Sequence, residues 1–172
     1  MSLYIPLIIS LLISTSGSPP AGPTIDGGFL SASGISHQSS DQELFLEQAD
    51  RALAVMVEAA GEMSVQGVAV VAFIPGNKSE TWISKMKVAG ALTNGSANFL
   101  AVAYSKAAEM ADTRKNSGNR DGEPMHGEFG YEGGVLEEVG PGYLMAVFSG
   151  ATGEQDTEIA KKGLEILKRG FR

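Results

Sequence analysis

One apolar segment, residues 65–74, constrains the fold of this chain more than any other feature. It is almost continuously apolar, contains four valines and ends at the turn-forming pair Pro75-Gly76. A run this short, rich in β-branched residues and closed by a turn, is typical of a strand. Because the run does not alternate with polar residues, both of its faces must be covered. The sequence therefore predicts a central strand with protein packed on each side of its sheet.

Three further strands are predicted around this one. After the turn at 75–78, residues 81–88 alternate, with Trp82, Met86 and Val88 on one face and Ile83, Lys85 and Lys87 on the other. This alternation predicts an antiparallel hairpin with one wetter face. Short apolar segments near 131–137 and at 143–149 predict two more strands.

Three helices are predicted from apolar periodicity and capping residues. The first spans about 41–62, starts at the capping box of Ser40 and Glu43, and carries apolar residues at three- and four-residue spacing. The second spans about 97–113, with Ser96 or Asn98 as its cap. The third follows a capping box at 152–155. Antiparallel strands packed by helices give an α+β layered domain.

Composition excludes several classes of function. The 172 residues suffice for one core, and the formal net charge of −7 disfavours nucleic-acid binding because it repels phosphates. Cysteine is absent, which excludes disulfides, thiol catalysis and thiolate metal sites.

The amino-terminal residues predict export. Residues 7–13 form a short apolar run followed by small residues, the pattern of a signal peptide over 1–18. We expect no stable membrane insertion after its removal, because a spanning helix needs roughly 20 apolar residues. Residues 19–40 are rich in Gly, Ser and Pro, which predicts a flexible leader before a single domain at 41–172. The expected location is secreted or periplasmic.

Four segments in a fixed order carry a family resemblance. They are the alanine-rich first helix, the strand Val68-Ala69-Val70-Val71, the helical segment Ala103-Tyr104-Ser105-Lys106-Ala107, and the closing stretch from Gly133-Gly134 through Gly140-Pro141-Gly142 to Ser149-Gly150-Ala151 and its helix. Together they resemble the GlcG/HbpS-like family, small domains that include extracellular haem-binding proteins. The resemblance implies a profilin-like antiparallel sheet of about five strands between helices, in three layers. It also implies a homo-oligomer and haem as the cofactor.

Candidate binding residues follow from this haem hypothesis. His126 is the predicted iron ligand, with Met125 or Tyr131 as an axial partner, and the neighbouring glycines would let a flat macrocycle approach. Lys106 could pair with a propionate or phosphate, and Met86 could line an apolar pocket. The alternatives are ordinary: a polar loop histidine, a lysine whose amine reaches water, and a core methionine. Asp156, early in the third helix, is explained by the helix dipole.

No catalytic constellation is present in the sequence. The sequence lacks three common motifs: the Gly-x-Ser-x-Gly turn of serine hydrolases, a zinc-binding helix with two histidines, and a Gly-x-Gly-x-x-Gly loop that opens a helix. The leading hypothesis is an exported domain that binds or sequesters haem or a similar flat small molecule. The alternatives are an accessory enzyme or corrinoid-handling domain, and a ligand-free oligomeric structural module.

Overall fold

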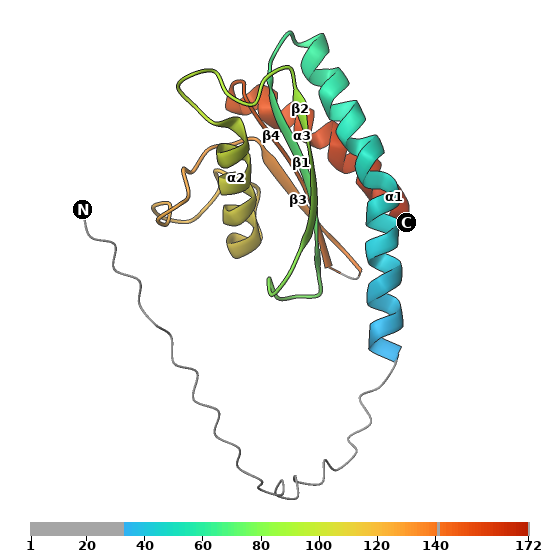
Figure 1. Cartoon of the computed structure of the whole chain (residues 1–172). Helices are drawn as coiled ribbons and strands as arrows, with labels where there is room; N and C mark the ends of the chain where they lie inside the picture. Colours follow the sequence, from blue (N-terminus) through green and yellow to red (C-terminus); the bar gives the residue numbers. More distant parts are fainter. Residues whose placement is uncertain (1–32, 141, 172) are drawn as a thin grey trace, which may run out of the picture. The chain divides into compact units, whose positions relative to one another are not determined.

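A four-stranded antiparallel sheet with strand order β2-β1-β4-β3 organises the fold (Figure 1). The structure, a computed structural model, describes residues 33–140 and 142–171. Its strands are β1 (Gly67–Pro75), β2 (Ile83–Ala89), β3 (Gly134–Val139) and β4 (Gly142–Ser149). Strand β1 pairs with both β2 and β4, and all its residues except Pro75 are buried. The prediction of a central strand covered on both faces is confirmed.

Helices cover both faces of this sheet (Figure 1). They are α1 (Ser33–Glu62), α2 (Phe99–Thr113) and α3 (Gly153–Leu167), followed by the short 3₁₀ helix η1 (Lys168–Phe171). Successive β1 side chains point to opposite faces, so Val71 and Phe73 join α1 and α3, whereas Val70 and Ile74 join α2. The chain is therefore α+β, as predicted.

Aromatic packing holds the face that α1 and α3 cover. The Phe73 ring lies between Phe45 of α1, with ring centroids 6.2 Å apart, and Phe171 of η1, at 5.4 Å. Gly163 of α3 lies against Met56 of α1, and a side chain at this glycine would collide with the methionine. The two helices can approach each other closely because of this glycine.

Two predictions about the elements need correction. Helix α1 begins at Ser33 and not near 41, so Ser40 lies inside the helix and does not cap it. A helix fixed by packing extends by one hydrogen bond per residue, so it can continue through residues of low propensity such as Ser and Gly. The described sheet has four strands, where the resemblance implied about five.

Other boundaries agree with the sequence. Asn98 caps α2 by accepting a hydrogen bond from Ala101 N, and the capping box of Thr152 and Gln155 opens α3. The predicted signal peptide and residues 19–32 of the predicted leader lie outside the described residues. Among the helices that the structure describes, none is long and apolar enough to cross a membrane.

Phe73→Ala should lower the free energy of unfolding by about 3–5 kcal/mol, because it removes a fully buried ring from between two others. Leu46→Ala serves as the control, since Leu46 lies on the same side of the sheet but is 43% exposed. Chemical denaturation of both variants measures the difference. Equal losses of stability would contradict the packing described above.

Candidate functional site

A buried ion pair joins α2 to α3 where β4 ends. The Lys106 Nζ atom lies 2.7 Å from Asp156 Oδ2 and donates a second hydrogen bond, of 2.8 Å, to the carbonyl oxygen of Phe148. The side chains of Lys106 and Asp156 are only 3% and 4% exposed. The other carboxylate oxygen, Asp156 Oδ1, accepts a hydrogen bond from Ala151 N at 2.9 Å. The pair is thus anchored to backbone groups on both sides.

Glycine at position 133 makes room for this ion pair. Gly133 has a φ of 124°, and its carbonyl accepts a hydrogen bond from Phe148 N at 2.9 Å. A Cβ atom here would overlap Lys106 Nζ and Asp156 Cβ and would lie 2.9 Å from the Phe148 carbonyl oxygen. Both the backbone angle and the available space therefore require glycine at this position.

Burial shifts the pKa of both charged groups toward the neutral forms. Desolvation lowers the pKa of Lys106, and the charge and hydrogen bond of Asp156 offset only part of this effect. Desolvation also raises the pKa of Asp156, against the opposing influence of Lys106 and of backbone N–H groups. A proton is therefore held less firmly by this lysine, and more firmly by this carboxylate, than by exposed groups of the same type.

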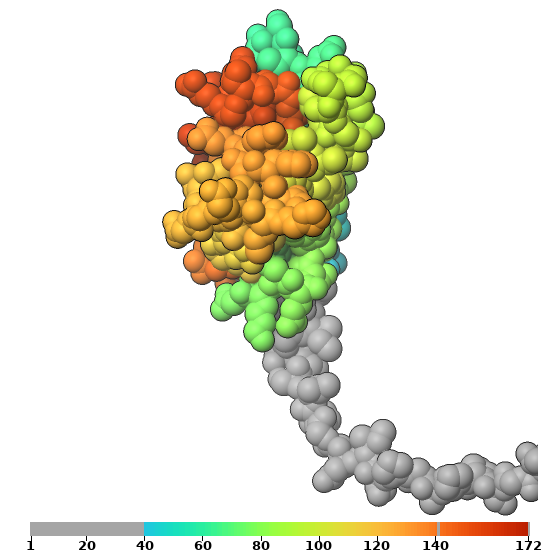
Figure 2. Space-filling view, turned by 90° about the vertical axis from the view of Figure 1, so that its left-hand side faces the viewer, coloured from blue at the N-terminus to red at the C-terminus, as the bar shows by residue number. Residues whose placement is uncertain are grey.

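The ion pair forms part of the wall of a cavity of about 490 Å³. Three segments line it: the loop before α2 together with the first part of α2, residues 130–132, and the passage from β4 into α3. Figure 2 shows these segments meeting on one face of the molecule, coloured yellow-green, orange and red-orange respectively. The cavity therefore lies where three stretches distant in sequence converge.

The cavity wall mixes apolar and polar groups, and it carries more acidic than basic side chains. Its charged residues are Lys106, Asp156 and Glu132, and Asn94 and Ser149 add neutral polar groups. Two carboxylates against one ammonium leave the wall with an excess of negative charge.

A pair of aromatic rings lies beside the cavity. Tyr131 lines it, is 54% exposed, and stacks on Phe129 with ring centroids 5.6 Å apart and planes inclined by 24°. Exposed aromatic rings of this kind offer a flat surface on which another planar group can stack.

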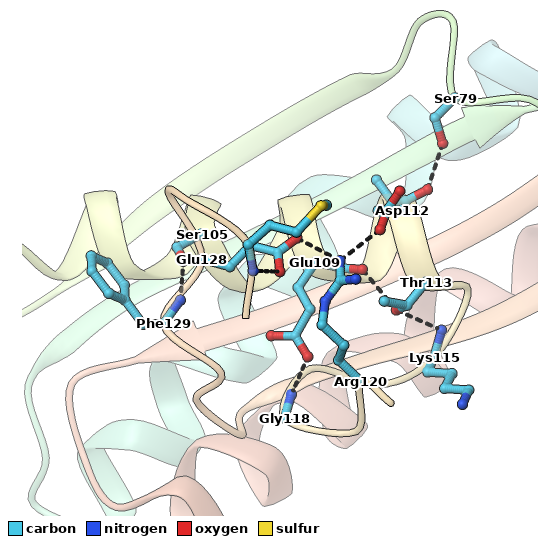
Figure 3. Close-up of polar contacts among 12 residues, drawn as sticks. Ser79, Ser105, Glu109, Asp112, Thr113, Lys115, Gly118, Arg120, Glu128 and Phe129 are labelled. Carbon is cyan, nitrogen blue, oxygen red and sulfur yellow. Dashed lines mark hydrogen bonds and ion pairs between the residues drawn. The ribbon is translucent and has the colours of Figure 1, made fainter. Parts of the chain in front are cut away.

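Polar contacts with α2 hold the segment that carries these rings (Figure 3). Glu109 Oε1 accepts a 2.8 Å hydrogen bond from Gly118 N, and Ser105 Oγ accepts one of 3.1 Å from Phe129 N. The guanidinium of Arg120 binds Glu128 within the segment and Asp112 on α2, at 2.9 and 2.6 Å. Tyr131 is thereby positioned from α2 even though its segment has no regular secondary structure.

Of the five residues predicted from sequence, the cavity brings together Lys106 and Tyr131. Met125 and His126 are exposed on the segment held by Arg120, and neither is part of the cavity wall. Met86 lies on β2 and is 36% exposed, because α2 lies over β1 and β4 rather than over β2. Among the described residues, no group of three or more His, Asp or Glu side chains could hold a metal ion.

Sequence reasoning missed Asp156 as a partner of Lys106. Asp156 lies in the first turn of a helix, where the helix dipole is enough to explain an acidic residue. It is also 50 residues from Lys106 in the sequence, so no local pattern links the two. The signal that could have found it is Lys106 itself, since a lysine on a mostly apolar helix face requires a buried counter-charge.

A second hollow, of about 890 Å³, lies between the β1–β2 turn and the carboxyl-terminal half of α2. It is wider and shallower than the Lys106 cavity, and Trp82 and Arg114 are among its lining residues. The Arg114 guanidinium lies 4.4 Å from the centre of the Tyr143 ring, so this cation already has an aromatic partner. None of the described residues that line this second hollow is a buried charged residue like Lys106 or Asp156.

No protein-family model matches this chain, and no curated protein matches it. Function must therefore be inferred from the cavity and its side chains.

Lys106→Met should lower the free energy of unfolding by about 3–5 kcal/mol, because it leaves the Asp156 carboxylate buried without its counter-charge. Lys106→Met combined with Asp156→Leu should recover most of this loss, since two apolar side chains need no counter-charge. Lys115→Ala, which breaks an exposed ion pair with Asp121, should cost about 1 kcal/mol or less. Thermal and urea unfolding measure all three variants. A double variant less stable than Lys106→Met would show that the buried pair itself stabilises the fold.

Proposed function

We propose that this chain is a small-molecule-binding domain whose ligand occupies the cavity beside Lys106 and Asp156. The observation that carries the proposal is a buried ion pair forming the wall of an open cavity. The cavity volume of about 490 Å³ lies in the range typical of ligand sites. Titratable groups with shifted pKa values in a cleft are a further mark of such sites.

The cavity favours a flat ligand without strong negative charge. The stacked rings of Phe129 and Tyr131 offer a planar contact surface, and the backbone of Gly130, Gly150 and Gly153 adds no side-chain bulk. Glu132 and Asp156 together outweigh the single charge of Lys106. A ligand with several exposed anionic groups would meet net repulsion at this wall.

Haem is the specific candidate that the resemblance to the GlcG/HbpS-like family implies. Tyr131 is the residue of the cavity wall whose chemistry fits ferric iron, because a tyrosine oxygen serves as the axial ligand in some haem proteins. Bound haem would supply redox or gas-binding chemistry, while this chain would hold and shield it. Lys106 is already paired with Asp156, which disfavours its predicted role as a propionate partner.

The same resemblance supports export to a secreted or periplasmic location and assembly into a homo-oligomer. The placement of α1 and α3 on one face and α2 on the other supports the three-layer, profilin-like arrangement.

One observation favours a structural oligomeric module as the second candidate. Strand β2 is an edge of the sheet, and its Met86 and Val88 side chains are 36% and 38% exposed. Exposed strand edges with apolar side chains are surfaces on which other chains pair.

Titration of the purified protein with hemin tests the haem proposal. A shifted Soret band should appear, and Tyr131→Phe should weaken the affinity by at least about tenfold through loss of the phenolic oxygen. Tyr143→Phe is the matched control, because Tyr143 lies on β4 outside the cavity wall. His126→Ala should leave the affinity unchanged. Absence of any band shift would exclude haem, and loss of binding only in His126→Ala would place the iron on the exposed segment.

A further inference from the structure

Lys106 offers chemistry beyond the holding of a ligand. Lys106 lines the cavity, and a carboxylate oxygen of Asp156 lies 2.7 Å from its primary amine. The Nζ atom of a protonated lysine carries three protons. Two are donated, to Asp156 and to the Phe148 carbonyl, and among the described residues no acceptor is found for the third. One N–H of Lys106 is therefore without a protein acceptor among the described residues, in a residue that lines the cavity.

We propose that Lys106 captures the carbonyl carbon of a small aldehyde as a reversible imine. This inference rests on the proposed function, because it places the aldehyde in the same cavity. A desolvated lysine is a recognised nucleophile toward carbonyl groups. The fold supplies both requirements of the reaction at one point, an amine removed from water and a base beside it.

The reaction balances with the groups present. The Lys106 ammonium first gives a proton to Asp156, and the free amine attacks the aldehyde carbon to form a C–N bond and a carbinolamine. The hydroxyl of the carbinolamine then leaves as water, taking up the proton from Asp156. The products are a protonated imine on Nζ, the Asp156 carboxylate and one molecule of water, and no oxidant or reductant is consumed. A protonated imine would keep its positive charge beside Asp156.

Burial favours the first step. Desolvation lowers the pKa of Lys106 and raises that of Asp156, so proton transfer from the ammonium to the carboxylate costs less here than between exposed groups. The amine fraction at a given pH rises about tenfold for each unit by which a lysine pKa falls. Lys106 should therefore react at a lower pH than exposed lysines do.

The surroundings indicate the class of aldehyde. Tyr131 and Phe129 favour a planar molecule, and the negative charges of Glu132 and Asp156 disfavour a carboxylate or phosphate on it. Gly133 lies against the amine and leaves no room for a side chain there. The expected ligands are small, flat and uncharged aldehydes.

Reductive trapping tests the proposal. The full chain is incubated with 4-hydroxybenzaldehyde and cyanoborohydride, which reduces an imine to a stable amine, and mass spectrometry of peptides gives the occupancy at each lysine. Near neutral pH, Lys106 should carry more adduct than the exposed Lys87 and Lys161. This excess should shrink as the pH is raised toward about 10, where the amines of exposed lysines also lose their protons. Occupancy of Lys106 equal to or below that of the exposed lysines would overturn the proposal.

Three variants separate a chemical role from a structural one. Lys106→Arg keeps a cation beside Asp156 but forms no imine, so it should abolish the trapped adduct at this position only. Asp156→Asn removes the group that returns a proton to the carbinolamine hydroxyl, so trapping at Lys106 should slow at least about tenfold even though loss of the carboxylate lowers the pKa of Lys106 further. Glu132→Gln should raise the reaction rate of 4-carboxybenzaldehyde relative to that of the uncharged aldehyde. Unchanged trapping in Asp156→Asn, with the fold verified by circular dichroism, would contradict the role of the carboxylate.

Binding of 4-hydroxybenzyl alcohol distinguishes failure of this inference from failure of the proposed function. This molecule has the same ring and cannot form an imine, and saturation-transfer NMR reports its binding. Binding of the alcohol without an adduct on Lys106 would overturn the imine and leave the ligand cavity standing. If neither an adduct on Lys106 nor binding of the alcohol is seen, the imine and the ligand cavity are both overturned for ligands of this class.

Discussion

The ion pair between Lys106 and Asp156 is the constraint on which the site depends. It joins a helix on one face of the sheet to a helix on the other, at the point where β4 ends. Two charges removed from water are costly, and hydrogen bonds to Phe148 and Ala151 offset part of that cost. Apolar side chains of similar volume often stabilise a fold as well as a buried ion pair does. The proposed function gives this charged pair a role, because Lys106 and Asp156 both line the adjacent cavity.

Backbone geometry explains how a cavity can lie so close to a buried charge. Gly133 brings the chain against the amine without a side chain, and Gly150 reverses direction directly after β4. Arg120 and Glu109 then fix the irregular segment that leads to Tyr131. The cavity is lined both by these irregular segments and by α2, which contributes Phe99, Val102 and Lys106.

The sequence predicted the fold better than the site, for physical reasons. Apolar periodicity acts over neighbouring residues, so the run ending at Ile74 identified the central strand and the capping box at Thr152 identified the start of α3. The start of α1 was missed because residues 33–40 include four serines and a glycine, which have low helix propensity. Lys106 and Tyr131 were recognised as residues, but the partnership with Asp156 spans 50 positions and leaves no local pattern. His126 stood out by residue type alone, and the fold leaves it exposed.

The two ligand hypotheses involve different residues of the same cavity wall. Haem would depend on the Tyr131 oxygen at the exposed side, whereas an aldehyde would depend on the Lys106 amine at the buried side. Both share the aromatic surface of Phe129 and Tyr131, and both would meet the negative charge of Glu132. A macrocycle with two propionates is penalised by that charge, while an uncharged aldehyde is not. Electrostatics of the wall therefore favour the smaller ligand, and the phenolic oxygen is the feature that favours the larger one.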